Sequence, residues 1–409
     1  MNEPGSNEEQ FTEIDGVLIE RIERPQTIEA LSNALADANE RETVVVPVGG
    51  GTLLGLGNRL ESSPVAISTR AINRVLAYEP ADLTLSVEAG ATLTEINQRL
   101  GEQGQWLPIE APFPERATIG GLIATAFAGP RRLGSETIRD LIVGISVVHA
   151  NGTVTKAGGT VVKNVTGFDM MRLYHGSLGT LGVIVSANFK VLPRPRTERT
   201  LLASYSDLDQ ALTASRAILQ SRARPVALDV ISRNGAESWM LAARFEGRSG
   251  TVSVMETEAA SFLAGASNDV VIDAESASWW QTELNRWNEP SARAIRVRLT
   301  SRPRLVDALA KNVLAHFEIF PPRAVSIAPG LGRVDFEFDL DITGENRDEF
   351  FRILYQGADN VSVSLSPTEF KQGIDVWGRV PETIDVMRSL KQEFDPSHIL
   401  NRGRFAGFI

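Results

Sequence analysis

The spacing of apolar residues predicts alternating strands and helices over the first half of the chain. One helix face is formed by Ile28, Leu31, Leu35 and Ala38. Thr27 directly precedes this face and is of a residue type that caps helices, so the helix is expected to begin there. Apolar runs at 17–22 and 43–46 flank the helix and complete a β-α-β unit.

The same patterning continues as far as the middle of the chain. Residues 82–90 alternate between apolar and polar positions, which predicts a half-buried strand. Thr92 and Glu95 have the spacing of a capping box and predict a second helix. Residues 141–156 predict a β-hairpin, with the dipeptide Asn151-Gly152 favouring a type I′ turn.

The second half of the chain has fewer glycines, and Pro193 and Pro195 indicate a domain boundary before it. Helices are predicted at 206–219 and 303–316, and strands at 226–231, 239–245, 293–299, 323–328 and 333–340. This mixture predicts an α+β layer with one sheet face covered. A last helix is predicted to end at Asp395-Pro396, and no internal repeat is evident in the sequence.

Three glycine-rich segments stand out at 47–57, 117–126 and 176–184. The first follows a predicted strand, and three successive residues without a Cβ can turn their N–H groups toward one anion. By itself this segment is equally well interpreted as an ordinary turn, and the second as a site of close helix packing. The first contains neither a Walker loop nor a Gly-x-Gly-x-x-Gly that opens a helix, so it does not predict either of those nucleotide sites.

Composition narrows the class of protein. The 409 residues are enough for two or three domains, and 43% hydrophobic with 22% charged residues is typical of a globular protein. A formal net charge of -10 argues against a nucleic-acid surface. Because the chain has no cysteine, it has no disulfide, thiolate zinc site or Cys-ligated iron–sulfur cluster.

The chain shows no apolar run long enough to span a bilayer and no pattern of a secretory signal. We therefore expect a cytoplasmic protein, with any contact to the inner membrane made through partners. Residues 1–15 are acidic and polar, without periodicity, and are expected to form a disordered leader.

The order and spacing of the glycine-rich segments over residues 25–195 resemble the flavin-binding half of the vanillyl-alcohol-oxidase and p-cresol-methylhydroxylase (PCMH-type) superfamily. The resemblance implies non-covalent FAD, since no His lies in the 47–57 loop where some members attach the flavin. It implies these FAD-binding residues: Pro47, Val48, Gly49, Gly50, Gly51, Thr52, Thr118, Ile119, Gly120, Gly121, Gly134, Gly182, Val183 and Ile184.

Further stretches are similar to the family of FAD-binding subunits of three-part glycolate oxidase complexes. They are 129–132 with Arg139-Asp140, the segment 158–169, and the closing segments 394–396 and 400–405. The resemblance implies a PCMH-type FAD-binding domain of two α+β subdomains at 16–195, an α+β cap domain with an antiparallel sheet at 196–375, and a tail at 376–409 that returns to the FAD domain.

That family implies oxidation of glycolate or a related 2-hydroxyacid to the 2-oxoacid, beside a second flavin subunit and an iron–sulfur subunit. Two alternatives stay open: a free-standing FAD oxidase or dehydrogenase, and a flavin-binding scaffold without chemistry. The paired His ligands of the related hydroxyacid dehydrogenases are missing, because the chain has only His149, His175, His316 and His398. No metal site and no particular catalytic residue are predicted.

A few charged and aromatic residues remain as weaker candidates. Lys163, Asp169 and Arg172 either line the flavin site or pair on the surface. Arg296 and Arg298 share one face of a predicted strand, where they either bind a carboxylate or form a solvated face. The tryptophans Trp279, Trp280 and Trp287 indicate cap packing or a subunit contact.

Overall fold

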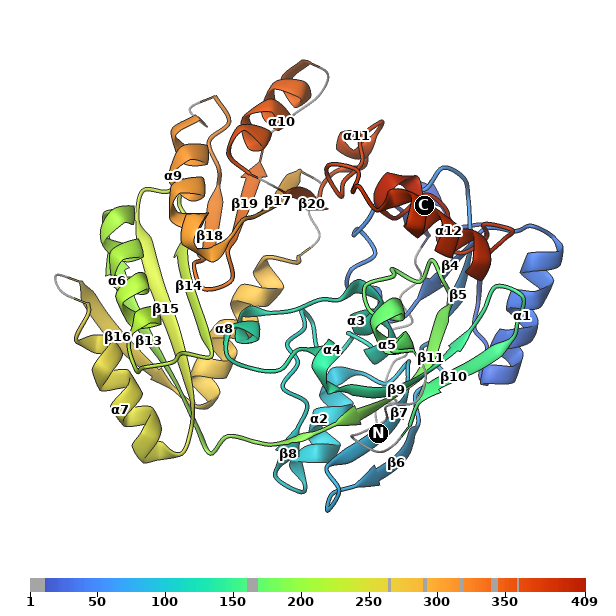
Figure 1. Ribbon diagram of the computed structural model, residues 1–409, viewed down its shortest axis with the longest axis horizontal. Helices are drawn as coiled ribbons and strands as arrows, with labels where there is room; N and C mark the ends of the chain where they lie inside the picture. The colour runs from blue at the N-terminus through green and yellow to red at the C-terminus, as the bar shows by residue number, and fades with distance from the viewer. Residues whose placement is uncertain are drawn as a thin grey trace, which may run out of the picture.

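The computed structural model describes residues 12–159, 168–263, 266–289, 293–316, 319–339, 345–358 and 360–409. It has an α+β architecture in which two smaller sheets, formed by the N-terminal part of the chain, lie beside one large sheet formed by the part after residue 196 (Figure 1). The C-terminal helix runs back over the smaller sheets. These features match the fold that the sequence predicts.

The first small sheet is parallel. Its order is β3 (Arg21–Glu23), β5 (Val65–Ser68) and β4 (Val45–Val48). The helix α1 (Ile28–Glu40) connects β3 to β4 and buries Leu31, Leu35 and Ala38, with Thr27 as its N-cap, as predicted. The other edge of β4 pairs with the far end of the chain, through a parallel bridge between Val45 and Leu400.

The second small sheet is antiparallel and has five strands. Their order is β10 (Val154–Gly158), β9 (Ile142–Val148), β11 (Val183–Lys190), β7 (Thr84–Glu88) and β6 (Val75–Glu79). Its helices are α2 (Leu93–Gly101), α3 (Ile119–Thr125), α4 (Ile138–Leu141) and α5 (Met170–Tyr174). The capping box of Thr92 and Glu95 is present at the start of α2. Short pairs β1–β2 (Glu13–Ile14, Val17–Leu18) and β8–β12 (Gln105–Trp106, Leu192–Pro193) lie beside these sheets.

Two local predictions are wrong. The hairpin β9–β10 forms, but its turn is not type I′, because Gly152 has a φ of 81° while Asn151 is absent from the residues with positive φ. The bonds from Gly152 N to His149 O and from His149 N to Thr153 O instead close a three-residue loop. Residues 12–15 are also not a disordered leader: Ile14 is buried and Asp15 forms ion pairs, whereas residues 1–11 lie outside the described part.

The large sheet is antiparallel throughout, and its eight strands follow the order β16, β13, β15, β14, β18, β19, β17, β20. In chain order their bounds are β13 (Thr197–Tyr205), β14 (Ala227–Ser232), β15 (Trp239–Gly247), β16 (Ser267–Ile272), β17 (Ala294–Thr300), β18 (Ala324–Ala328), β19 (Arg333–Asp339) and β20 (Asn360–Leu365). One face carries α6 (Leu208–Gln220), α7 (Ser249–Ala260), α9 (Val306–His316) and α10 (Glu345–Gly357). The opposite face carries α8 (Ala274–Arg286), whose Trp280 packs on Ala227 and Ala242 (Figure 1).

The chain order of these elements reveals a repeat that the sequence does not show. β13-α6-β14-β15-α7-β16 and β17-α9-β18-β19-α10-β20 are two β-α-β-β-α-β units. They meet where β14 pairs with β18, and the strand order of the second unit mirrors that of the first. We call the β14–β18 junction the seam. The predicted single layer is therefore two units, with β13, β16, β20, α7, α8 and α10 added to the elements expected from the sequence.

The end of the chain returns to the small sheets as predicted. After α11 (Thr368–Lys371), the helix α12 (Ile384–Phe394) ends before Asp395-Pro396. Lys391 is buried at its end and donates to Asp395, to Thr180 O at 2.9 Å and to Leu400 O at 2.8 Å. This buried ammonium ties the tail to the segment that precedes β11. No helix among the described residues, including those of the tail, combines the length and apolar character needed to cross a membrane.

Candidate functional site

A groove opens between the two small sheets, where the three glycine-rich segments meet. Counting its open side, it encloses about 840 Å³. Its lining includes twelve of the fourteen predicted residues: Pro47, Val48, Gly49, Gly50, Gly51, Thr52, Thr118, Gly120, Gly121, Gly182, Val183 and Ile184. The other two predicted residues lie elsewhere: Ile119 is fully buried in the core of the antiparallel sheet, and Gly134 lies against Val226.

The glycines after β4 are required by close packing within the chain. A Cβ on Gly50 would lie 1.7 Å from Arg116 O, and one on Gly49 would lie 2.1 Å from Thr118 Oγ1. Gly51 has a φ of 71°, which favours glycine. These contacts press the loop against the chain that leads into α3, so that the surface of the groove here is backbone.

The second glycine-rich segment forms the start of α3. Thr118 caps this helix by accepting from Gly121 N at 3.4 Å, and Gly120 N donates to Ala89 O at 2.8 Å. A Cβ on Gly121 would meet only Thr118 Oγ1, at 3.3 Å. A larger side chain at Gly121 would therefore extend into the groove, whereas Gly120 is held against β7.

The C-terminal segment completes the groove with Asn401 and Arg404. Neither residue was predicted from the sequence to bind FAD. Asn401 Nδ2 donates to Leu178 O at 2.5 Å, and its Oδ1 is buried without a hydrogen-bond donor among the described residues. This amide oxygen is available to an N–H donor of a ligand. The signal in the sequence was the segment 400–405 after a helix end, in which the polar residues Asn401 and Arg404 are buried.

Two buried cations hold the loop that forms one wall of the groove. Arg404 donates through Nη2 to Leu54 O (2.6 Å) and Leu56 O (2.5 Å), and Lys371 donates through Nζ to Gly55 O (2.6 Å) and Gly57 O (3.1 Å). Asp15 bridges them, at 2.8 Å from Lys371 Nζ and 3.2 Å from Arg404 Nη1. Burial lowers the pKa of Lys371, although Asp15 opposes that shift. One surplus positive charge thus lies beneath a backbone-lined groove.

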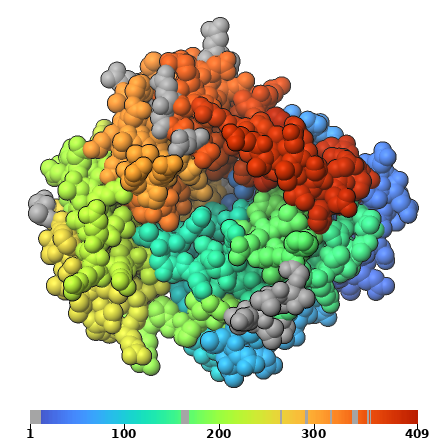
Figure 2. Space-filling view, in the orientation of Figure 1, coloured from blue at the N-terminus to red at the C-terminus, as the bar shows by residue number. Residues whose placement is uncertain are grey.

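A second, larger hollow adjoins the groove, and we call it the cavity. It lies over the seam, between the large sheet, α8 and the segment 125–132, and encloses about 1810 Å³ counting its open side. Leu53, Leu56 and Thr125 line both hollows, so the groove and the cavity share a wall. On the visible face, the molecule is hollowed where the C-terminal half of the chain meets the segment around residues 120–130 (Figure 2).

The cavity is lined by charged and aromatic side chains. Its charged residues are Arg132, Asp229, Glu283, Arg296, Arg298, Arg333 and Asp335, and its tryptophans are Trp280, Trp287 and Trp377. Arg296 and Arg298 do share a strand face, as predicted, but Arg296 is buried and paired with Glu337 at 2.7 Å. Arg298 pairs with Asp335 through Nε at 2.7 Å and keeps a side chain 37% exposed. The solvated strand face is therefore wrong for Arg296.

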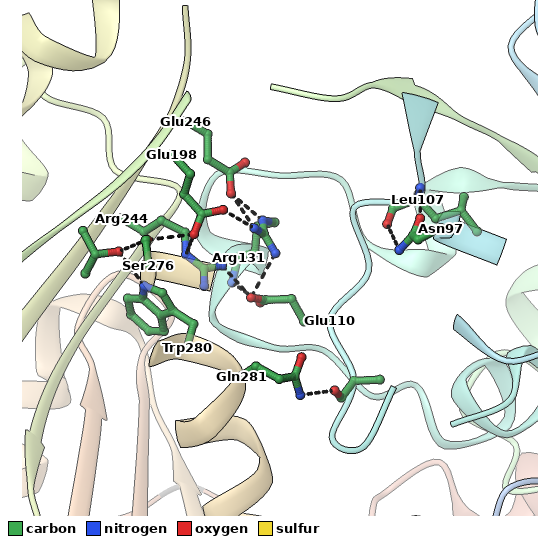
Figure 3. A network of polar contacts seen from close by, with 12 residues as sticks. Asn97, Leu107, Glu110, Arg131, Glu198, Arg244, Glu246, Ser276, Trp280 and Gln281 are labelled. Atoms are coloured by element: carbon green, nitrogen blue, oxygen red, sulfur yellow. Dashed lines mark hydrogen bonds and ion pairs between the residues drawn. The ribbon is translucent and has the colours of Figure 1, made fainter. Parts of the chain in front are cut away.

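A buried ionic network joins the large sheet to the N-terminal part of the chain (Figure 3). Arg131 pairs with Glu110 (3.1 Å), with Glu198 (3.1 Å) and with Glu246 (2.6 Å). Arg244 pairs with Glu110 at 2.7 Å and lies over the ring of Trp280. Burial alone would raise the pKa of Glu110, but the two guanidinium groups outweigh it and lower the pKa. Burial raises the pKa of Glu246, against the effect of Arg131.

The remaining sequence candidates lie outside both hollows or outside the described residues. Asp169 caps α5 and pairs with Arg172, and both are exposed, whereas Lys163 lies outside the described residues. Burial lowers the pKa of His149, whose Nε2 lies 2.8 Å from Thr155 Oγ1. No group of three or more His, Asp or Glu within the described ranges is arranged to hold a metal ion.

The family comparisons agree with this geometry. Residues 19–158 match the model described as FAD binding domain, and residues 378–405 match the C-terminal domain of FAD linked oxidases. The chain is thus an FAD-dependent oxidoreductase, and the two matched segments are the ones that meet at the groove.

Individual relatives extend over most of the chain. Glycolate oxidase subunit GlcD of Bacillus subtilis strain 168 is 27% identical over 93% of this chain and 87% of that protein. Glycolate oxidase subunit GlcE of Escherichia coli strain K12 is 32% identical over 55% of this chain and 61% of that protein. A D-2-hydroxyglutarate dehydrogenase of Xanthomonas citri pv. viticola is 27% identical over 94% of this chain and 88% of that protein.

The solved structures of alkyldihydroxyacetonephosphate synthase share the fold. The TM-score is 0.68 at 19% identity, over 92% of this chain and 75% of that one. This similarity concerns the backbone alone.

The groove fits FAD on its own features. Its glycine-lined backbone leaves room for a large anion to lie against N–H groups. The buried surplus charge of Lys371 and Arg404 complements a pyrophosphate, and Asn401 Oδ1 offers an acceptor to a ring N–H. The residues that would hold the cofactor are therefore those of the three glycine-rich segments together with Asn401.

Proposed function

We propose that this chain is the FAD-binding subunit of a glycolate oxidase or dehydrogenase type of complex, which oxidises glycolate or a related 2-hydroxyacid to the 2-oxoacid. The relatives named as glycolate oxidase subunits and as a 2-hydroxyacid dehydrogenase support this substrate class. FAD, when bound, supplies the two-electron acceptor. The domains are proposed at 16–195, 196–375 and 376–409.

The observation that carries the proposal is the shared wall between groove and cavity. Leu53, Leu56 and Thr125 belong to both linings, so the two hollows adjoin there, and a small acid at that end of the cavity would lie against a cofactor in the groove. Arg298 donates to Asp335 through Nε only, and its Nη atoms have no protein partner among the described residues. A guanidinium edge of this kind binds a carboxylate.

The partner subunits follow from what the chain lacks. It contains no cysteine, so an iron–sulfur centre that accepts the electrons would belong to another subunit. The described lining of the groove contains no His, Cys or Tyr, which supports non-covalent FAD. A second flavin subunit completes the proposed complex.

The test is to isolate the complex from the native host, identify its subunits and count its flavins. Anaerobic addition of glycolate, D-lactate or D-2-hydroxyglutarate is expected to bleach the flavin absorbance, and an iron–sulfur subunit is expected to co-purify. A chain that always purifies alone and is fully reduced by a hydroxyacid would be a free-standing dehydrogenase. Bound FAD that no substrate reduces, within an active complex, would make this subunit a scaffold.

A further inference from the structure

The three carboxylates that line the cavity differ in how well their charges are compensated. Asp335 pairs with Arg298 at 2.7 Å and with Arg333 at 2.9 Å. Glu283 pairs with Arg233 and, at 3.6 Å, with Arg286. Asp229 has only Arg333, whose Nη2 lies 3.9 Å from Oδ2 and thus beyond hydrogen-bond distance. Asp229 Oδ1 is buried and has no hydrogen-bond partner among the described residues.

The fold explains why this carboxylate points away from the hydrophobic core. On β14, Leu228 and Val230 belong to the core under α6, so Asp229 between them lies on the opposite sheet face. That face lines the cavity, and β14 is one of the two strands at the seam. Asp229 is therefore held in place by an eight-stranded sheet while its side chain remains only 5% exposed.

The surroundings of Asp229 move the pKa of its carboxyl group toward neutral pH. Burial raises the pKa of Asp229 to about 7, and Asp335, Glu110 and Glu283 add to the shift while Arg333 opposes it. The other charged groups that line the cavity are Arg132, Arg296 and Arg298. Asp229 is thus the cavity carboxylate that changes charge around neutral pH, where proton transfer by a positioned group is most efficient.

Resting on the proposed function, we propose that Asp229 is the catalytic base of this site and accepts the hydroxyl proton of the 2-hydroxyacid. The substrate O–H bond breaks, its proton moves to Asp229 Oδ1, and the C–O bond becomes the carbonyl of the 2-oxoacid. FAD, when bound in the groove, would supply the two-electron acceptor for the hydrogen on the substrate carbon and the electron pair of its C–H bond.

The main experiment compares Asp229→Asn with the wild-type complex. The variant is expected to keep its FAD and to bind the product analogue oxamate, but to lose roughly 100-fold or more in kcat/KM, the usual contribution of a positioned base. In the wild type, kcat/KM is expected to rise with pH around a midpoint near 7, and this rise is expected to be absent from the variant. Asp269→Asn, on the exposed strand β16, is the matched control and should match the wild type.

A second variant tests the same residue without removing it. In Asp335→Asn the neighbouring negative charge is lost and Arg333 becomes free to approach Asp229, so the pKa of Asp229 should fall. The midpoint of the pH profile is then expected to move to lower pH while turnover persists. An unchanged midpoint in this variant would contradict the assignment.

Thermal unfolding gives a readout that is independent of turnover. Because the folded-state pKa of Asp229 is raised to about 7, above its unfolded value near 3.9, folding takes up a proton between these values. The stability cost of this carboxyl therefore grows as the pH rises toward 7. The Tm of Asp229→Asn relative to wild type should be more favourable at pH 8 than at pH 5.

The outcomes separate this inference from the proposed function. If a 2-hydroxyacid reduces the wild-type flavin but Asp229→Asn is as fast and keeps the pH midpoint, the base is another group and the function stands. If no 2-hydroxyacid reduces the flavin even in the assembled complex, the proposed function fails and this inference fails with it.

Discussion

The groove and the cavity share a wall, yet they offer a ligand different kinds of surface. In the groove, Gly49, Gly50 and Gly51 expose backbone because close packing or a positive φ leaves no place for a side chain. In the cavity, strands and α8 present Arg298, Asp229 and other charged side chains across the seam. On the proposed function, a cofactor of constant structure would contact main chain, and the reacting acid would contact side chains that can be exchanged without altering the backbone.

The largest effect is expected when a side chain is introduced into the groove, where the backbone forms the surface. Gly50→Val is expected to lose nearly all bound FAD, measured as flavin absorbance per mole of purified protein. The sequence alone predicts a collision with the cofactor and a folded cap. The structure adds a collision with Arg116 O, so the chain leading into α3 should shift as well. Loss of a ligand present at ~100 times its dissociation constant removes about 2.7 kcal/mol, and the strain adds to it.

A matched pair of glycines separates the two effects. Gly121→Leu should fill the groove with little internal clash, because its Cβ meets only Thr118 Oγ1 at 3.3 Å. It is expected to remove FAD while the apoprotein unfolds at nearly the wild-type temperature. Gly101→Val, whose Cβ would meet no atom within 4 Å, is the control and should retain FAD. Full flavin occupancy in Gly121→Leu would show that the groove does not hold the cofactor.

Replacing the buried Arg404 tests whether FAD binding in the groove also depends on side chains. In Arg404→Met the carbonyls of Leu54 and Leu56 lose their donor, and a buried unpaired polar group costs about 1–3 kcal/mol. The affinity for FAD should fall at least roughly tenfold, the factor that 1.4 kcal/mol represents, as measured by flavin fluorescence titration. Arg402→Met is the control, since Arg402 bonds to His398 O and Ser397 O, away from the groove. Equal FAD affinity in the two variants would contradict the role of Arg404.

The next prediction concerns the buried ionic network that joins the large sheet to the N-terminal part of the chain. Glu110→Gln removes a carboxylate that pairs with both Arg131 and Arg244, and breaking a buried pair costs about 3–5 kcal/mol. Because the pKa of Glu110 is lowered in the folded state, its stabilisation is present above the unfolded pKa and is lost as pH falls through the folded one. The difference in urea midpoint between the variant and wild type should therefore shrink in acid.

Glu246→Gln provides the contrast within the same network. Among the described residues Glu246 pairs with Arg131 alone, and burial raises its pKa whereas the pKa of Glu110 is lowered, so the fold stabilises the ionised form of Glu246 less than that of Glu110. Its effect on stability at neutral pH should be well below that of Glu110→Gln. Equal losses in both variants would show that the contact of Glu110 with the second guanidinium, that of Arg244, does not set the size of the loss.

The smallest effect is expected outside both hollows. Arg172→Ala breaks an exposed pair with Asp169, and such pairs contribute about 0–1 kcal/mol. FAD affinity and kcat/KM should remain at wild-type values. A clear loss of either would support the alternative that Arg172 lines the flavin site.

The sequence predicts the groove far better than the cavity, and the reason is physical. Glycines forced by close backbone approach occur as contiguous runs, so Gly49–Gly51 and Gly120–Gly121 are visible as motifs. Asp229 and Arg333 approach each other only because β14, β18 and β19 pair, and nothing local to either residue indicates this. Arg404 was visible only as part of a tail motif, since its contacts with Leu54 and Asp15 join distant parts of the chain.

The large sheet shows the same limit at the level of the fold. Strands with buried apolar residues, such as β14 and β18, were predicted close to their observed bounds. The edge strand β16 was missed because its residues 267–269 are exposed and polar, and the repeat was missed because topology, rather than sequence, is what the two units share.

The bridge between Val45 and Leu400 has a consequence for the order of events during synthesis. The wall of the groove formed by Asn401 and Arg404 leaves the ribosome after the glycine-rich segments, with the whole large sheet synthesised in between. While the glycine-rich segments are already outside, the buried cations that hold residues 54–57 are still missing. Capture of the flavin is therefore a late step, and a nascent chain that stalls before residue 400 would be unable to retain it.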